Sequence, residues 1–87
     1  GLSNVSNGCP KDLRGLIEDE ALENLDKYLD DAYVAGLKEV RIIHGKGTGA
    51  LREAVMAHLK KHRQIKSFRM GDYNEGGTGV TVAELNL

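Results

Sequence analysis

The sequence has one cysteine in 87 residues and no long run of apolar residues. A secreted domain of this size usually carries paired cysteines, so a lone cysteine favours a reducing, cytoplasmic setting. Nothing beside Cys9 would activate a thiolate, and we expect this residue to be inert. A membrane-spanning helix needs roughly 18 or more apolar residues in a row, so none is expected and no membrane partner is predicted.

The chain begins without Met, without a basic segment and without an apolar segment. We therefore expect no secretory signal, and a chain that is a fragment or a processed product. A chain this short buries roughly 60% of its unfolded surface, enough for one domain with a modest core. Residues 1–9 are small and polar, and we expect them to be a flexible lead-in to a monomeric domain over residues 10–87.

Charge is unevenly distributed although the net charge is only −1. Seven acids lie between Glu18 and Asp31, with Lys27 as the one base among them. From Lys38 to Arg69 the balance reverses, with nine Lys or Arg residues against two acids. This asymmetry can give one basic face for an anionic partner, while two solvated helix faces are the simpler explanation from charge alone.

Apolar periodicity and turn residues predict two helices and four strands. The first helix has acids at its start and Gly36 at its end, where a left-handed residue commonly stops a helix. The order β-α-β-α-β-β makes the first two strands parallel and predicts a two-layer α/β sandwich with a small mixed sheet. In chain order the elements are a strand at Lys11–Arg14, a helix over Glu18–Ala35, a strand at Glu39–His44, a helix at Ala50–His62, a strand at Ile65–Met70, a loop at Gly71–Gly79 and a strand at Val80–Leu85.

The segment VRIIHGKGTGALR, Val40–Arg52, predicts a buried strand, a glycine-rich turn and a helix start. Glycines let backbone amides approach a ligand, and a helix N-terminus adds partial positive charge. The spacing fits neither a Walker A loop nor a dinucleotide fingerprint. A tight connection that needs glycine only for its geometry is the alternative. We expect an anion site formed by Gly45, Lys46, Gly47, Thr48, Gly49 and Arg52.

His44 ends the strand just before this turn. An imidazole beside a bound phosphate could donate or accept a proton near neutral pH, although a hydrogen-bonded structural histidine is an equal alternative. His58 and His62 lie on the second predicted helix, where we expect packing and C-terminal charge.

Asp12 and Arg14 project to the same face of the first predicted strand. If the first two strands are neighbours, Arg14 lies near His44 and Lys46. Arg14 could clamp a phosphate, and Asp12 could orient a water, hold a metal or lock an arginine. An ordinary Asp–Arg pair at a strand edge is the alternative.

The segment NEGGTG, Asn74–Gly79, predicts a flexible hairpin connection. Within it, Glu75 is the acid that could swing toward the anion site. Arg69 ends the basic stretch just before this loop, and we expect both side chains to contact nucleic acid.

Taken together, DLRG, HGKGTGALR and NEGGTGVTVAEL, in this order, resemble the small MutS-related (Smr) domain. They are most similar to the version at the C-terminus of the bacterial MutS paralogue that suppresses recombination. The likeness runs from Lys11 to Leu85 and implies a βαβαββ sandwich similar to the C-terminal domain of bacterial initiation factor three. It also implies nicking endonuclease activity, on DNA and often branched DNA in some members, on RNA in others. Lys11 stands where the family usually has Leu, and Arg14 replaces the His of many relatives, so no mechanism that needs this His carries over.

We therefore expect a cytoplasmic nucleic-acid-binding domain that cleaves phosphodiester bonds in branched or structured DNA. Asp12, Arg14, His44 and Lys46 are the expected catalytic residues. The Gly45–Gly49 amides would hold the scissile phosphate with Lys46 and Arg14, Asp12 would be base or metal ligand, and His44 an acid or phosphate contact. Mg²⁺ or Mn²⁺ is left open as a cofactor, since the sequence has no compact carboxylate cluster.

Two other functions remain open at this stage. A non-catalytic module would dock a larger MutS-like ATPase on branched DNA or on structured RNA such as that of a ribosome. A small-anion or nucleotide sensor would need a pocket, and no aromatic cluster for one is evident. Backbone-directed contacts suit both DNA and RNA, so the sequence does not choose between them.

Overall fold

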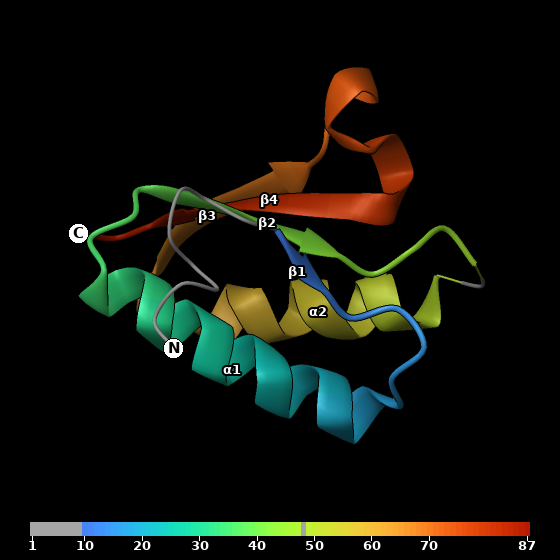
Figure 1. Cartoon of the computed structure of the whole chain (residues 1–87), viewed down its shortest axis with the longest axis horizontal. Coiled ribbons are helices and arrows are strands. Elements are labelled where there is room, and N and C mark those ends of the chain that lie inside the picture. The colour runs from blue at the N-terminus through green and yellow to red at the C-terminus, as the bar shows by residue number, and fades with distance from the viewer. Residues whose placement is uncertain (1–9, 48) are drawn as a thin grey trace.

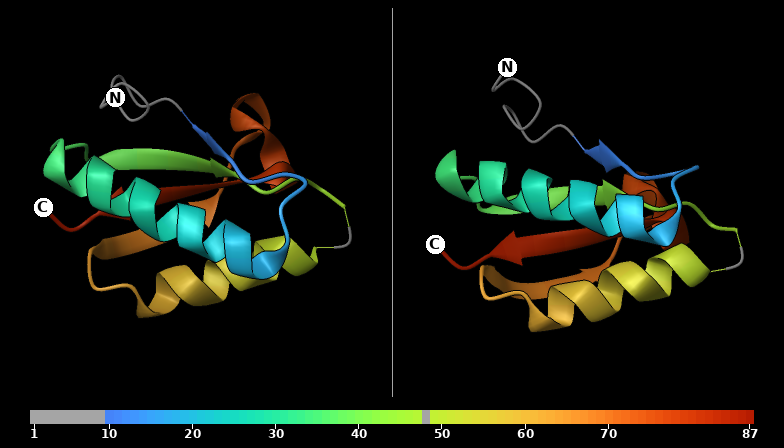
Figure 2. Two further views of the ribbon diagram at one scale, coloured as in Figure 1. Left: turned by 60° about the horizontal axis from the view of Figure 1, so that its bottom comes forward. Right: turned by 90° about the horizontal axis from the view of Figure 1, so that it is seen from below.

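The computed structural model describes residues 10–47 and 49–87. Two helices cover one face of a four-stranded sheet, and they run in the same general direction across it (Figures 1 and 2). The predicted β-α-β-α-β-β order and the two-layer architecture are confirmed. The elements are β1 (Lys11–Asp12), α1 (Glu18–Val34), β2 (Glu39–Ile43), α2 (Ala50–Lys61), β3 (Ile65–Met70), the 3₁₀ turns η2 (Tyr73–Glu75) and η3 (Gly77–Gly79), and β4 (Val80–Leu85).

The sheet is mixed, with the strand order β1-β2-β4-β3. Strand β1 is parallel to β2, as predicted, and β4 is antiparallel to both β2 and β3. Because parallel strands end at the same edge, the chain leaves β1 and β2 side by side. The antiparallel β4 begins at that same edge, since Ile43 at the end of β2 pairs with Val80 at the start of β4. Three separate segments of the sequence are thus brought together there.

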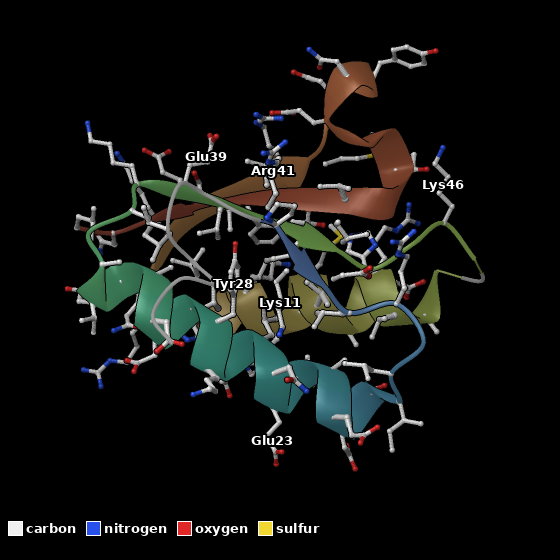
Figure 3. The ribbon with its side chains drawn as sticks, viewed as in Figure 1. Lys11, Glu23, Tyr28, Glu39, Arg41 and Lys46 are labelled. Carbon is white, nitrogen blue, oxygen red and sulfur yellow. The ribbon has the colours of Figure 1, made fainter. Side chains whose placement is uncertain are left out.

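Alternation along β2 decides which side chains face the helices. Val40 and Ile42 are buried against the helices, whereas Glu39 and Arg41 are exposed on the opposite side. Figure 3 shows Glu39 and Arg41 on the side of the sheet away from the helices. We call this side the open face. By register it carries Glu39, Arg41, Ile43, Ser67, Arg69, Val80, Val82 and Glu84.

The core lies between the helices and the sheet and includes five buried residues of α1 and two of α2. Helix α1 ends as predicted: Gly36 has a φ of +76°, and the amide of Leu37 donates to Ala32 O at 3.0 Å. The two helices are joined by a hydrogen bond between His58 Nε2 and Asp26 Oδ1 at 2.6 Å.

Lys11, at the position where the family usually has Leu, lies on the helix side of the sheet (Figure 3) and pairs in register with Ile42. Its side chain is only partly buried. The lysine stem can cover the edge of the core while the ammonium group reaches solvent, so β1 tolerates the exchange.

Several predicted boundaries were wrong. Strand β1 ends at Asp12 rather than Arg14, because the Asp12 carboxylate accepts the Arg14 amide at 3.0 Å and turns the chain. Strand β2 ends at Ile43 and α2 ends at Lys61, one residue short in each case. The expected flexible loop is instead two 3₁₀ turns, η2 and η3.

Some expectations concern residues for which the structure gives no description. Cys9, Thr48 and the lead-in over residues 1–9 lie outside the described residues. In the part of the chain that is described, no helix is long and apolar enough to cross a membrane.

Candidate functional site

A pocket of about 410 Å³ opens where β1 and β2 end and β4 begins. It combines all three sequence motifs, which lie far apart in the chain. We call it the site pocket. Its lining residues are Arg14, Ile43, Gly45, Lys46, Glu75, Gly76, Gly79 and Val80.

The glycine-rich turn after β2 is anchored on Gly79. The amides of His44 and Gly45 both donate to Gly79 O at 3.0 Å. A Cβ at Gly79 would lie 3.1 Å from Lys46 Cγ and 3.5 Å from the Gly45 carbonyl carbon, so glycine permits the close approach. Gly45 itself has a φ of +88°, and a Cβ there would lie 3.3 Å from Arg14 Cγ. Packing of glycines therefore places Lys46 beside Arg14.

Fewer backbone amides are available to bind an anion than the sequence predicted. The Gly45 amide is already bonded to Gly79 and is not available to a ligand. Among residues 10–47 and 49–87, the amides of Lys46 and Gly47 have no hydrogen-bond acceptor. Gly49 is the N-cap of α2, with a φ of +87°. Among the described residues of the turn, the amides of Lys46 and Gly47 and the helix start at Gly49 thus remain to hold an anion.

Asp12 and Arg14 form a bidentate pair. Asp12 Oδ1 accepts from Arg14 Nε at 2.9 Å, and Oδ2 accepts from Nη2 at 2.7 Å. These bonds, with the Arg14 amide, lower the pKa of Asp12 to about 2. A carboxylate with this pKa is a poor general base near neutral pH. Of the roles considered for Asp12, the geometry favours locking Arg14, whose Nη1 has no partner in the described chain.

His44 is buried rather than exposed to the site pocket. Its Nε2 lies 2.8 Å from Thr81 Oγ1 and its Nδ1 lies 3.1 Å from Gly45 O. Burial lowers the pKa of His44, which favours the neutral ring. Because Gly45 O can only accept, Nδ1 carries the hydrogen and Nε2 accepts from the Thr81 hydroxyl. The expected role as acid or phosphate contact does not agree with this geometry, in which His44 supports the turn.

Replacing Thr81 with valine should test the structural role of His44. Valine keeps the shape of Thr81 but removes the hydroxyl, leaving Nε2 buried and unpaired. The free energy of unfolding, measured by urea titration, should fall by about 1–3 kcal/mol. Thr78, which is exposed in η3, provides the matched control. An equal loss in Thr78→Val and Thr81→Val would contradict the assignment.

Glu75 and Arg69 bind each other, which differs from the nucleic-acid contacts expected of them. Arg69 Nη1 donates to Glu75 Oε1 at 2.8 Å, and Nη2 donates to Oε2 at 3.2 Å. The amide of Asp72 also donates to Glu75 Oε1, at 2.7 Å. These contacts lower the pKa of Glu75 to about 2. Glu75 lines the site pocket but is held in place, so its evident effect is to fix η2 beside the pocket.

Arg52 does not lie in the site pocket. It lines a separate depression with Glu53, Met56, Met70 and Thr81. Its charge acts on the other side of the sheet, where it helps to lower the pKa of His44. The turn therefore separates its two cations, with Lys46 in the site pocket and Arg52 on the helix side.

A protein-held metal does not fit these donors. Among the described residues, no group of three His, Cys, Asp or Glu side chains is arranged to hold an ion. The two carboxylates near the site pocket, Asp12 and Glu75, each use both oxygens to bind an arginine.

Arg41 was missed by the sequence interpretation. It lies on the open face, two residues before Ile43, which lines the site pocket. It has no ion pair or side-chain hydrogen bond with any described residue. The signal was present in the alternation of Glu39-Val40-Arg41-Ile42, which sends Arg41 away from the core, toward the same side as Ile43.

Comparison with known proteins gives a consistent family. Residues 11–86 match the model of the Smr domain. The chain is 65% identical over 74 residues to "Endonuclease MutS2" of Clostridium tetani and 64% identical to that of Pelotomaculum thermopropionicum. These matches cover 85% of this chain but only 9% of each relative.

Solved structures show the same fold. The Smr domain of Thermus thermophilus MutS2 superposes with a TM-score of 0.88 at 45% identity, covering 90% of this chain and 98% of that one. YdaL, a stand-alone small MutS-related protein of Escherichia coli, has a TM-score of 0.87 at 22% identity, covering 93% and 66%, and supports the fold alone. Since one family model spans nearly all described residues and a 45% identical Smr domain is covered almost completely, the chain belongs to the Smr domain family.

Proposed function

We propose that this domain binds nucleic acid and cleaves its phosphodiester bonds. The observation that carries the proposal is the site pocket, in which a preoriented Arg14 lies together with Lys46, whose backbone amide is open. Guanidinium, ammonium and amide groups are the donors that suit a phosphate. The relatives at 64–65% identity carry the name endonuclease, which supports cleavage as the chemistry.

Arg14 and Lys46 would act by stabilising the charge that grows on the phosphate in the transition state. In hydrolysis a water oxygen bonds to phosphorus and the bond to one sugar oxygen breaks. That oxygen takes up a proton and leaves as a hydroxyl. Asp12 holds the Arg14 guanidinium in place, so less reorganisation is needed as the charge develops. With Asp12 and Glu75 both ionised and His44 buried, electrostatic stabilisation is the effect that these residues supply.

We infer further that the domain works within a larger MutS-like protein on branched or structured DNA. The chain spans only 9% of its relatives, which supports a larger parent. The preference for branched DNA follows from the family resemblance alone. Contacts to the sugar-phosphate backbone suit RNA as well as DNA. Cleavage of DNA and RNA substrates of the same sequence would distinguish the two.

Nicking of supercoiled plasmid tests the proposal. Lys46→Ala should lower the nicking rate about 100-fold, because a charge facing the phosphate is lost. Asp12→Asn should keep more activity than Asp12→Ala, since an amide oxygen can still accept from Arg14. Each protein is assayed with EDTA, Mg²⁺ or Mn²⁺. Lys60→Ala, exposed on α2, is the control that should behave as wild type. Equal activity in wild type, Asp12→Ala and Lys46→Ala would overturn the catalytic assignment.

A non-catalytic docking module is the second candidate. It is favoured by one observation, that the two carboxylates near the site pocket, Asp12 and Glu75, have pKa values lowered to about 2, which do not suit general-base catalysis. This function predicts binding that weakens with salt and with loss of Lys46, without any turnover. The same assays separate the two functions, because the docking module would bind plasmid and leave it intact in all three metal conditions.

A further inference from the structure

The open face of the sheet continues directly from the site pocket. Ile43 and Val80 line the pocket and also belong to this face, where they pair across β2 and β4. No α-helix covers the face in the described part of the chain (Figures 1 and 2). The 3₁₀ turns η2 and η3 pack on this face at Val80, so a ligand held in the site pocket can extend along β2 beside these turns.

Arg41 supplies a positive charge on this path. It lies two residues from Ile43, a rise of about 7 Å along the strand. Its guanidinium is exposed and forms no ion pair or hydrogen bond with a described residue. Its charge acts at longer range on Glu75, where it helps to lower the pKa of the carboxyl that Arg69 binds directly. Figure 3 shows Arg41 and Lys46 projecting on the same side of the sheet, away from the helices. Two cations that form no ion pair with a described residue thus follow one direction across the surface.

Tyr73 adds an aromatic ring beside this path. It is completely exposed, with 100% relative accessibility, on η2. The turn is held by a capping box between Asp72 and Glu75 and by the Arg69–Glu75 pair. The ring therefore projects from a fixed turn whose last residue, Glu75, lines the site pocket. Single-strand binding proteins combine backbone-directed cations with such stacking rings.

We propose that the open face binds an unpaired nucleic-acid strand, whose backbone passes from Lys46 to Arg41 and one of whose bases stacks on Tyr73. This inference rests on the proposed function and names its substrate class, a single-stranded or frayed segment next to the cleaved bond. The path is short. Glu39 and Glu84 pair across β2 and β4 at the far end of the open face and repel a phosphate there.

A second basic cluster is the alternative surface on which a nucleic-acid strand could bind, and we call it the rival cluster. Lys60, Lys61, Arg63 and Lys66 lie around the end of α2 and the start of β3. They are separated from the turn by the whole 12-residue length of α2, roughly 18 Å at 1.5 Å per residue. Nothing connects this cluster with the site pocket as Ile43 and Val80 connect the open face. The two surfaces give opposite predictions for matched charge-neutralising variants.

Fluorescence anisotropy with a labelled 12-nucleotide single strand and its duplex, as DNA and as RNA, tests the proposal. The single strand should bind more tightly than the duplex. Arg41→Gln should weaken single-strand binding several-fold and lower the salt slope by about 1. Tyr73→Ala should weaken single-strand binding about tenfold and leave duplex binding unchanged.

The controls are an arginine and a tyrosine elsewhere on the surface. Arg63→Gln lies in the rival cluster, and Tyr33→Ala lies near the end of α1; both should bind as wild type. Equal losses in Arg41→Gln and Arg63→Gln, or a Tyr73→Ala variant that binds like wild type, would overturn this inference. Lys46→Ala distinguishes a failure of the proposed function from a failure of the open-face inference. If it also binds normally, the proposed function fails; if it alone weakens binding, only the open-face inference fails.

Discussion

Replacing Arg14 with alanine is expected to slow phosphodiester cleavage about 100- to 1,000-fold. Arg14 is the one cation of the site pocket whose direction is fixed by hydrogen bonds, through Nε and Nη2 to Asp12. Removing it takes away a donor already aligned for the transition state. Arg14→Lys should also be slow, by about tenfold or more, because an ammonium group cannot form the bidentate pair that aligns it. The measurement is the single-turnover nicking rate at saturating enzyme.

Folding should be unaffected in these Arg14 variants. The Arg14–Asp12 pair is exposed, with side-chain accessibilities of 61% and 48%, and exposed pairs add little to stability. The thermal midpoint should therefore match that of wild type. Arg63→Ala, an exposed arginine outside the site pocket, is the matched control and should cleave normally. A large fall in the thermal midpoint of Arg14→Ala would mean that misfolding, and not the loss of a catalytic group, explains any lost activity.

Replacing Gly76 with alanine is expected to produce the largest loss of stability. Gly76 has a φ of +113°, and a Cβ there would lie 2.4 Å from Val80 Cγ2. Neither the backbone conformation nor the space accepts a side chain. The free energy of unfolding should fall by about 2–4 kcal/mol. At about 4–8 °C per kcal/mol for a domain of this size, the thermal midpoint should fall by about 8–32 °C.

Two other glycines separate the causes of that loss. Gly77 also has a left-handed φ, +59°, but open space around its Cβ position, so Gly77→Ala should cost about 1 kcal/mol for the backbone alone. Gly47 has neither a left-handed φ nor a neighbour within 4 Å, so Gly47→Ala should change stability by less than about 0.5 kcal/mol. Equal midpoints for all three variants would contradict the packing of η2 and η3 on Val80.

Element order and the ends of α1 could be predicted because their causes are local. Acids in the first turn of α1 and Gly36 after its last turn act within a few residues of each other. Apolar alternation in β2 likewise decides its buried face without reference to the rest of the fold. The 3₁₀ turns after β3 were missed, because the side chain of Arg69 stabilises them through Glu75 across a gap in the sequence. The short β1 was missed because a side chain, Asp12, ends it.

The sequence by itself determined that a glycine-rich, cationic turn follows a buried strand, and that DLRG and NEGGTG accompany it. Only the tertiary structure decided which of these residues share a pocket. Parallel pairing of β1 with β2 brings Arg14 to Lys46, while the start of α2 carries Arg52 to the other side of the sheet. Hydrogen bonds then commit Asp12, Glu75 and His44 to partners. Residue type fixes what a side chain can do, but availability depends on contacts between distant segments, and these exist only in the folded chain.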